Sequence, residues 1–203
     1  MLLILLLLIA LFCCKKCCCC CCCGDKCETP VETVMPAEPA DDSLISDLGD
    51  AISFTLPDGT VCTIDKNSAE YKLFAFLNSD EEVDADKTKG WITLDKGHFH
   101  KGKANLNPES ETQLKNVAMI LKFFSDSHVK IGGYTDNTGT DKINNKLSAD
   151  RAKITVEKLI SLGIAAERIT SEGYGSKYPV CPKNDTDGCR AANRRVDIRV
   201  TQK

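Results

Sequence analysis

The chain has 203 residues, a formal net charge of −3 and an apolar share of 42%. This length allows one domain of ordinary size with additional tails, and the apolar share is sufficient for a hydrophobic core. Acidic and basic residues are spread fairly evenly, so the sequence lacks the concentrated positive charge that binds a nucleic-acid backbone. Nucleic acid is therefore not an expected partner.

The first 23 residues are the least typical part of the sequence. An unbroken apolar run, MLLILLLLIALFCC, is followed by Lys15 and Lys16 and then by consecutive cysteines from Cys17 to Cys23. The apolar run is about as long as a signal-peptide core and shorter than the roughly 20 residues of a membrane-spanning helix. Residues 1–23 are predicted to be either a processed export or lipidation signal or an uncleaved membrane anchor, and both alternatives make a membrane an expected partner.

A metal-binding interpretation of the cysteine run is less favoured. Zinc is held by four ligands, and an unbroken run lacks the spacers that would let four sulfurs surround one ion. His98 and His100 lie two positions apart on a predicted strand, but no third ligand accompanies them. No metal site and no other cofactor are therefore predicted, and the cysteines are interpreted as small apolar residues at a membrane boundary.

Two short regions follow the N-terminal segment. Residues 24–50 are rich in Pro, Ala, Glu and Asp with few large apolar residues, so they are predicted to form a flexible tether. Residues 51–90 begin with an alternating stretch around the turn triplet Pro57-Asp58-Gly59, which predicts a β-hairpin. The segment SAEYKLFAFLNS then has the apolar spacing of a short helix, so a small hairpin and helix subdomain is predicted.

Residues 91–203 alternate predicted strands with predicted helices. The strands are WITLD, HFHKGKANL, VKIGGY, ITSEGYG and VDIRVTQ. The helices are PESETQLKNVAMILKFF, DKINNKLSADRAKITVEKLISLG and GCRAANRR. Pro108 suits a first helical turn, and Gly163 suits a helix end. This order predicts an α+β sandwich, with helices packed on one face of a mixed sheet.

A polar stripe runs along the longest predicted helix. At about 100° per residue, Asn144, Ser148 and Arg151 fall within an arc of about 60°. The neighbouring arc is predicted to be the core face and contains Ala152, Val156, Leu159 and Ile160. The stripe lies at the end of the helix nearest the turn that carries Asp136, and a solvated helix face does not require such order.

Asp136 follows a predicted strand, in a turn where Gly139 can adopt positive φ. Its carboxylate is therefore expected to be held by local backbone. Arg151 offers a planar guanidinium that suits a carboxylate. These residues are consistent with a salt bridge that ties the turn to the helix, and equally with a receptor for a zwitterion. Spacing alone leaves both alternatives open.

Four separated motifs give a more specific indication. GYTDNTG, NNKLSADRA, EGYG and NRRVDIRV occur in the order found in the OmpA-like peptidoglycan-binding domain, the family that includes Pal and the C-terminal part of MotB. The chain resembles this family over about residues 92–203. The resemblance implies a βαβαββ-type α+β sandwich in residues 91–203. It also implies noncovalent binding of peptidoglycan through the diaminopimelate of its stem peptide.

The resemblance also implies roles for individual residues. In that family the turn aspartate contacts the diaminopimelate ammonium and the helix arginine contacts its carboxylate, which carries over to Asp136 and Arg151. The helix asparagine of the family matches Asn144, and its Asn-Arg-Arg triplet matches residues 193–195, of which Arg195 is taken as ligand-binding. Thr135 and Asn137 flank the aspartate and are expected to hydrogen-bond either the turn or the ligand, with the turn favoured. Tyr134 departs from the histidine often found at its position, and this leaves the acid and the arginine intact.

Three cysteines lie outside the N-terminal segment. Cys181 and Cys189 flank the polar loop PKNDTDG, and their separation allows a disulfide in an oxidising compartment. We expect this disulfide, because the N-terminal segment indicates export. Cys62 would then remain as an unpaired thiol in the hairpin.

Two other classes of protein are weaker alternatives. A cell-wall hydrolase would need a zinc site or paired catalytic carboxylates, which the sequence does not indicate, so the chain is predicted not to be an enzyme. A stator-like or other membrane-complex subunit would use the same wall-binding domain, but the apolar run lacks the carboxylate that carries ions. The expected location is the envelope of a Gram-negative bacterium, facing the periplasm and attached to a membrane, with the outer membrane favoured. Other envelope proteins are possible partners.

Overall fold

The computed structural model describes residues 45–96, 99 and 103–203. The predicted signal or anchor segment, residues 1–23, lies outside these ranges, as do His98 and His100 and most of the predicted tether. Within the described ranges, none of the helices combines the length and the apolar character needed to cross a membrane.

The leading part of the described chain is an antiparallel sheet of three strands, β1 (Ile45–Asp47), β2 (Ala51–Thr55) and β3 (Val61–Asp65). The predicted hairpin is confirmed as β2 and β3. The prediction of a flexible tether up to residue 50 is wrong for residues 45–50, because β1 pairs with β2 and Ile45 packs against the core. An ion pair of 2.7 Å between Asp47 and Lys66 also holds β1 at this edge.

The hairpin turn and the following helix form for local reasons. Gly59 has φ of 83°, and the Asp58 carboxylate accepts a hydrogen bond of 2.9 Å from the backbone N–H of Thr60. Helix α2 (Ala69–Asn78) begins after Ser68, whose hydroxyl accepts from the N–H of Tyr71. The predicted short helix is thus confirmed.

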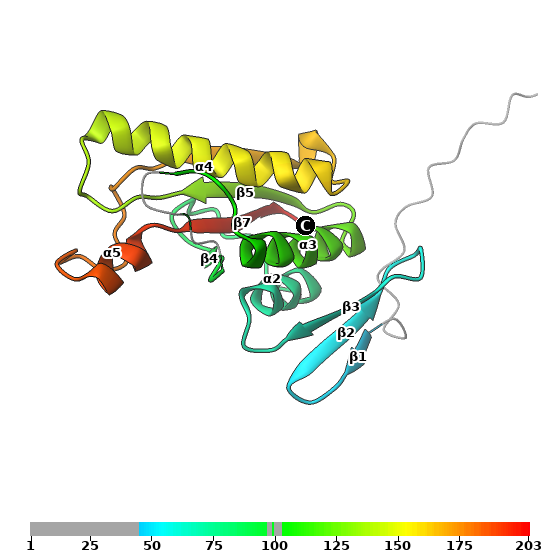
Figure 1. The fold of residues 1–203 in the computed structure, drawn as a ribbon. Coiled ribbons are helices and arrows are strands. Elements are labelled where there is room, and N and C mark those ends of the chain that lie inside the picture. Colours follow the sequence, from blue (N-terminus) through cyan, green and yellow to red (C-terminus); the bar gives the residue numbers. More distant parts are fainter. Residues whose placement is uncertain (1–44, 97–98, 100–102) are drawn as a thin grey trace, which may run out of the picture. The chain divides into compact units, whose positions relative to one another are not determined.

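The second sheet has four strands, β4 (Trp91–Thr93), β5 (His128–Gly133), β6 (Ile169–Gly173) and β7 (Val196–Gln202). Their order is β4-β7-β5-β6 (Figure 1). Strands β5 and β6 are parallel, whereas β7 is antiparallel to both β4 and β5. The predicted mixed sheet is confirmed.

Two long helices, α3 (Pro108–Phe123) and α4 (Asp141–Ser161), contribute to the core, and α4 packs on β5 and β6. Asn107 caps α3 and Thr140 caps α4 through side-chain oxygens, and Gly163 has φ of 96° just after α4 ends. A 3-10 turn, η2 (Ala166–Arg168), precedes β6, and the short helix α5 (Asp187–Asn193) precedes β7. These elements confirm the predicted α+β fold.

One predicted strand does not form where it is described. Residues 103–106 of the HFHKGKANL segment are not a strand, and most of the remainder lies outside the described ranges. Side chains of α3 hold the chain just before this segment: the Ser110 hydroxyl donates to the Lys96 carbonyl at 2.6 Å, and the Gln113 amide oxygen accepts from the Lys96 N–H at 3.1 Å.

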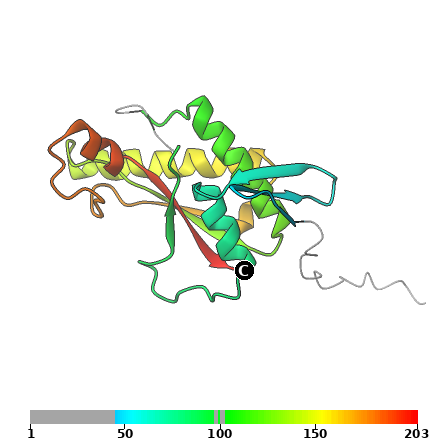
Figure 2. The same cartoon turned by 90° about the horizontal axis from the view of Figure 1, so that it is seen from below.

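The hydrophobic core is continuous from the leading sheet to the main sheet. Phe54 of β2 lies 5.1 Å from the rings of both Phe74 in α2 and Phe123 in α3, measured between ring centroids. Figure 2 shows the leading strands beside α2 and α3. Because α3 also packs on α4, the apolar residues of the hairpin support the helices that cover the main sheet.

Candidate functional site

The polar stripe of α4 lies in the buried interface with the sheet. Asn144 is 4% exposed, and both Ser148 and Arg151 are 0% exposed. Ala152 and Leu159 of the predicted core face are also buried, but Ile160 is 39% exposed, so the prediction is wrong for that residue. The buried face of α4 therefore includes the polar stripe and lies closer to it than the sequence predicted.

Two glycines explain how a polar helix face can pack so closely. A Cβ at Gly133 of β5 would lie 2.1 Å from the Ser148 carbonyl oxygen, and a Cβ at Gly173 of β6 would lie 2.4 Å from the Ala149 nitrogen. Any side chain would push α4 away from the strand ends. The Ser148 hydroxyl accepts a hydrogen bond of 2.9 Å from the N–H of Gly175 and fixes the helix to the chain after β6.

Arg151 is anchored to backbone on both sides of the site. Its Nε donates to the Lys103 carbonyl at 3.1 Å, and its Nη1 donates to the Tyr134 carbonyl at 3.4 Å. The Phe99 ring lies 5.1 Å from the guanidinium carbon. Burial lowers the pKa of Arg151 to about 10, helped by the nearby charge of Arg194 and opposed by that of Asp136. The guanidinium stays charged at neutral pH.

The Asp136 carboxylate is the acidic centre of the turn and is only 6% exposed. One oxygen accepts from the N–H of Thr138 at 3.0 Å and from its hydroxyl, and the other accepts from Arg194 Nη1 at 2.9 Å. Burial favours the neutral acid, but these hydrogen bonds and the Arg194 charge outweigh it, so the pKa of Asp136 is lowered. The carboxylate is therefore ionised at neutral pH, with Arg194 as its ion-pair partner.

Three other predicted residues surround the turn. Thr135 is 4% exposed, and its hydroxyl oxygen has no hydrogen-bond partner in the described part of the chain. The Asn137 side-chain oxygen accepts from the amide of Asn184. The Asn144 amide donates to the Gly139 carbonyl at 3.3 Å, so it holds the turn against α4.

A small cavity of about 30 Å³ opens beside the turn. Its lining residues come from the turn, the loop after β6 and the end of α5, and they are Thr135, Asn137, Ser176, Pro179, Pro182, Asn184 and Asn193. This volume suits one small polar group or one water molecule. The unpartnered Thr135 hydroxyl is thus placed at a cavity that can supply its missing partner.

The loop between β6 and α5 is braced at its base. Cys181 and Cys189 form a disulfide, with their Cα atoms 5.3 Å apart. The Asn193 amide donates to the Cys181 carbonyl at 2.9 Å and to the Asn184 side-chain oxygen at 3.0 Å. Cys62 is a buried free thiol, and burial together with the nearby Glu70 charge raises its pKa to about 11.

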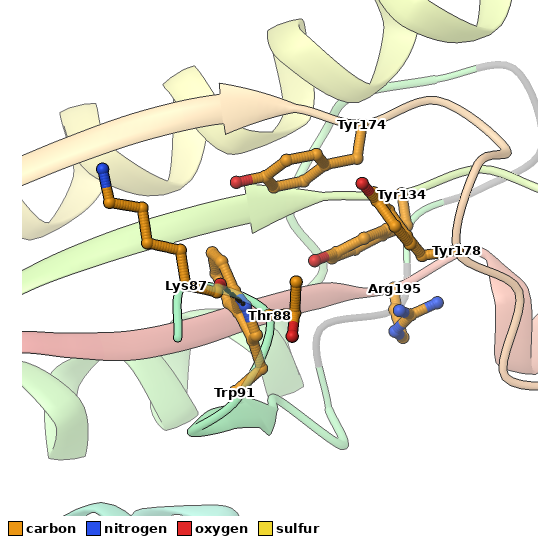
Figure 3. Close-up of a pocket in the computed structure, with 7 residues that line it drawn as sticks. All are labelled: Lys87, Thr88, Trp91, Tyr134, Tyr174, Tyr178 and Arg195. Carbon is orange, nitrogen blue, oxygen red and sulfur yellow. Dashed lines mark hydrogen bonds between the residues drawn. The ribbon is translucent and has the colours of Figure 1, made fainter. Parts of the chain in front are cut away.

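Arg195, also predicted to contact the ligand, faces a different pocket. Its Nε pairs with Asp197 at 3.0 Å, and its guanidinium carbon lies 3.8 Å from the Tyr134 ring centroid. The pocket has a volume of about 190 Å³ and is lined largely by aromatic residues (Figure 3). The prediction missed Arg194 as the partner of Asp136, although the Asn-Arg-Arg triplet contains it. Side chains of consecutive residues in extended backbone point to opposite sides. Because Arg194 and Arg195 directly precede β7, this rule would have predicted that they face different sites.

Among the described residues, the side chains around Asp136 do not form a metal-binding site. In the described ranges, no group of three or more His, Cys, Asp or Glu side chains is arranged to hold a metal ion. The site combines one ionised carboxylate with two guanidiniums. It can therefore bind a ligand that carries both an ammonium and a carboxylate through charge-assisted hydrogen bonds.

Comparisons with known proteins agree with the resemblance that the sequence motifs indicated. Residues 98–194 match the model of the OmpA family. The peptidoglycan-binding protein ArfA of Mycobacterium tuberculosis is 44% identical over 102 residues, which cover 50% of this chain and 31% of ArfA. The probable lipoprotein YiaD of Escherichia coli is 37% identical over 103 residues, which cover 51% of this chain and 47% of YiaD. The chain thus spans less than half the length of either relative.

A solved structure supports the fold. The periplasmic domain of MotB from Helicobacter pylori superimposes with a TM-score of 0.50 at 25% identity, covering 56% of this chain and 76% of that domain. Residues 98–194 thus match the OmpA family, in agreement with the resemblance that the four sequence motifs indicated.

Proposed function

We propose that the chain binds peptidoglycan noncovalently, through the diaminopimelate side chain of the stem peptide, and so tethers a membrane to the cell wall. The observation that carries this proposal is the ionised, nearly buried Asp136 carboxylate flanked by Arg194 and Arg151. Diaminopimelate ends in an ammonium and a carboxylate on one carbon. A fixed anion beside fixed cations is complementary to both.

The contacts follow from the charges. The ligand ammonium binds the Asp136 carboxylate, and the ligand carboxylate binds Arg194, whose side chain is 22% exposed and so accessible. The unpartnered Thr135 hydroxyl and the side chains of Asn137 and Asn144 complete the polar surroundings. Each charge-assisted hydrogen bond contributes about 1.5–3 kcal/mol, so two or three of them are enough for micromolar affinity after the costs of association.

In this proposal Arg151 acts without contacting the ligand directly. Its side chain is fully buried and donates to the Tyr134 carbonyl, so it positions the backbone of the turn. Its positive charge also lies close enough to interact with both Asp136 and Arg194. Arg151 therefore orients the acid and favours binding of the ligand carboxylate by its field, whereas Arg194 offers the hydrogen bonds.

Attachment to the envelope is the second part of the proposal. Weak contacts to a polymer, made by many tethered copies, hold by avidity, so a membrane anchor and micromolar affinity are sufficient. We place the domain on the periplasmic side of a Gram-negative envelope, with the outer membrane favoured. The names of two relatives, a probable lipoprotein and an outer membrane porin, support this placement.

The test is co-sedimentation of the 203-residue chain, in mild detergent, with purified sacculi that contain diaminopimelate. Asp136→Asn keeps the shape of the side chain and removes its charge. Glu157→Gln makes the same change on the exposed face of α4, where Glu157 pairs only weakly with Lys153 at 3.7 Å. We expect retention to fall at least tenfold in Asp136→Asn, to persist in Glu157→Gln, and to be displaced by free diaminopimelate. Equal retention of both variants would contradict the proposal.

A second candidate is a subunit of a larger membrane complex that uses the same domain to hold the wall. The likeness to the MotB periplasmic domain favours this candidate. Cross-linking in intact cells distinguishes the two. A stoichiometric complex with another membrane protein would support the subunit, and cross-links to peptidoglycan alone would support the simple tether.

A further inference from the structure

A pocket on the other side of the main sheet is separate from the charged turn. A Cβ at Gly132 would lie 2.9 Å from the Trp91 ring and 3.1 Å from Tyr134 and Tyr174, whereas a Cβ at the next residue, Gly133, would meet α4. The aromatic pocket therefore occupies the face of the sheet that α4 does not cover. Its volume of about 190 Å³ is below the roughly 300–1,000 Å³ of pockets for drug-sized ligands, so it suits a single ring.

The walls of the aromatic pocket are four aromatic side chains, Trp91 from β4, Tyr134 from the end of β5, and Tyr174 and Tyr178 from the loop after β6. Tyr134 and Tyr174 stack with their ring centroids 5.2 Å apart, and Trp91 lies edge-to-face against both. Tyr178 is 54% exposed and lies edge-to-face against Tyr174. In Figure 3, Arg195 lies at one end of this cluster and Lys87 at the other. The pocket combines apolar ring surfaces with hydrogen-bond donors.

Arg195 gives the pocket an unused donor. The residue is 6% exposed, and its Nε is bound to Asp197, but its Nη1 is buried and has no hydrogen-bond partner in the described part of the chain. Buried donors are paired in the great majority of proteins, so an unpaired one requires an explanation. A ligand oxygen in the pocket would supply the missing acceptor.

We propose that the aromatic pocket binds an N-acetylated hexosamine ring of the wall glycan. A saturated sugar ring has an apolar C–H face that packs on aromatic rings, and polar oxygens around its edge. The Nη1 of Arg195 then donates to the acetamido carbonyl, and Lys87 and Thr88 at the rim are placed to reach the ring hydroxyls.

The position of the pocket supports a polymer that reaches both sites. Tyr134 in the pocket is two residues from Asp136, and Arg195 follows Arg194 directly. The backbone N–H of Tyr134 donates to the Arg195 carbonyl at 3.0 Å, so one backbone junction carries both sites. An extended peptide covers ~3.3 Å per residue, so three residues of a stem peptide reach about 10 Å from the turn to its sugar. In this respect the inference rests on the proposed function.

Part of the pocket lies outside the segment that matches the family. Lys87, Thr88, Trp91 and Arg195 all lie outside residues 98–194. The indole N–H of Trp91 donates to the Lys87 carbonyl at 3.0 Å, which fixes the loop before β4 over the sheet. The sugar site therefore depends on the leading region of this chain, and not on the charged turn alone.

Trp91 is the only tryptophan in the chain, so its fluorescence reports directly on the pocket. We would titrate the 203-residue chain, in mild detergent, with a tetrasaccharide of N-acetylglucosamine, which contains no peptide. Cellotetraose, which lacks the acetamido group, is the matched control ligand. We expect a saturable change in Trp91 emission with the first sugar and at least tenfold weaker binding of the second, because Arg195 would then stay unpaired.

Variants assign the response to the pocket. Tyr178→Ala should weaken sugar binding by about 5–10-fold, and Arg195→Lys, which keeps the charge but removes the Nη1 donor, by about tenfold. Val180→Ala changes an exposed residue of the same loop that does not line the pocket, and should bind normally. Asp136→Asn should also leave the sugar titration unchanged.

The outcomes separate this inference from the proposed function. No saturable response to millimolar N-acetylglucosamine tetrasaccharide, or a response unaffected by both Tyr178→Ala and Arg195→Lys, would overturn the sugar site even if diaminopimelate still displaces the chain from sacculi. A normal sugar titration with no effect of Asp136→Asn on retention would instead overturn the diaminopimelate site and leave the sugar site standing.

Discussion

The end of β5 carries two sites of different kinds. The turn site is a network of charges and hydrogen bonds in which both oxygens of Asp136 are already paired. The aromatic pocket is an open space between rings, with a buried donor that has no partner among the described residues. Adjacent glycines face the two sides, Gly133 toward α4 and Gly132 toward the rings. On one side of β5, close packing against α4 holds the charged turn site rigid. On the other side, the aromatic rings leave a pocket.

The difference lies in how each site selects a ligand. The turn site fixes its charges before any ligand arrives, so a ligand with complementary charges gains hydrogen bonds without reorganising the protein. The aromatic pocket selects by shape and by one polar contact. Because the two sites share the backbone junction between Tyr134 and Arg195, changes on either side of this strand end can test whether they act independently.

The largest effect is expected from Gly133→Ala. The new Cβ would lie 2.1 Å from the Ser148 carbonyl oxygen, which belongs to backbone, so α4 must move away from the sheet. We expect a loss of about 3 kcal/mol or more in the free energy of unfolding, measured by urea titration. Retention on sacculi should fall with it, because α4 carries Arg151 and supports the turn.

Gly188→Ala is the matched control for this substitution. Gly188 lies in α5, and a Cβ there would have no neighbour within 4 Å. Alanine is the better helix former, so this variant should be unchanged or more stable by about 0.5–1 kcal/mol. Similar stabilities for the two variants would show that α4 does not depend on its close approach to β5.

The sequence predicted the turn site better than the aromatic pocket for a physical reason. Asp136, its neighbours and Arg151 lie in short contiguous motifs, whose local spacing places them on a turn and on one helix face. The ion pair with Arg194 depends on where β7 meets β5, which spacing within one element cannot reveal. The aromatic pocket is assembled from residues as distant as Trp91, Tyr174 and Arg195, so no single motif contains it.

The same reasoning explains two errors in the structure predicted from the sequence. Residues 45–50 have the composition of a tether, but a single pairing with β2 orders them once the hairpin exists. Ile160 fits an amphipathic helix pattern, yet glycines at 133 and 173 turn the polar stripe toward the sheet instead. In both cases tertiary packing overrides a correct local pattern.

The next largest effect concerns the brace that serves both sites. The loop closed by the disulfide follows Tyr178 of the aromatic pocket and contains Asn184 of the small cavity. For a separation of eight residues, the Cys181→Ala, Cys189→Ala double variant should lose about 2–3 kcal/mol of unfolding free energy. Both retention on sacculi and the sugar response should weaken.

Reduction of the wild-type chain is the control for this prediction. It breaks the same bond without changing any residue, and it should lower the urea midpoint to that of the double variant. If the double variant unfolds at the same urea concentration as oxidised wild type, the disulfide does not brace the loop. If only one of the two readouts, retention on sacculi or the sugar response, weakens, then the loop supports only the corresponding site.

A smaller effect is expected from the charge of Asp136. Its pKa is lowered in the folded state, so ionised Asp136 stabilises the fold fully above the unfolded-state pKa of about 3.9. That contribution is lost as the pH falls through the lower folded-state pKa. Asp136→Asn should therefore be about 1–2 kcal/mol less stable than wild type between pH 5 and 8, and the difference should shrink below about pH 4.

Unfolding free energies across this pH range, measured for both proteins in the same buffer series, check the sign. Glu157→Gln serves as the control because its side chain is 58% exposed and its pair with Lys153 is screened by solvent. A difference between Asp136→Asn and wild type that grows as the pH falls would mean that the carboxylate is held neutral, which would remove the anion that the turn site requires.

The smallest change in stability is expected from Gly132→Ala, on the pocket side of the same strand. The three nearest atoms to its Cβ would belong to side chains, Trp91 at 2.9 Å and Tyr134 and Tyr174 at 3.1 Å, so these rings would have to shift and the backbone of α4 would not. We expect a loss of about 1 kcal/mol or less, together with a changed Trp91 emission and weaker sugar binding, while retention through diaminopimelate stays intact. Gly133→Ala should give the opposite pattern of a large stability loss. A similar loss from both variants would mean that the strand end behaves as one packed unit and that the two sites cannot be separated.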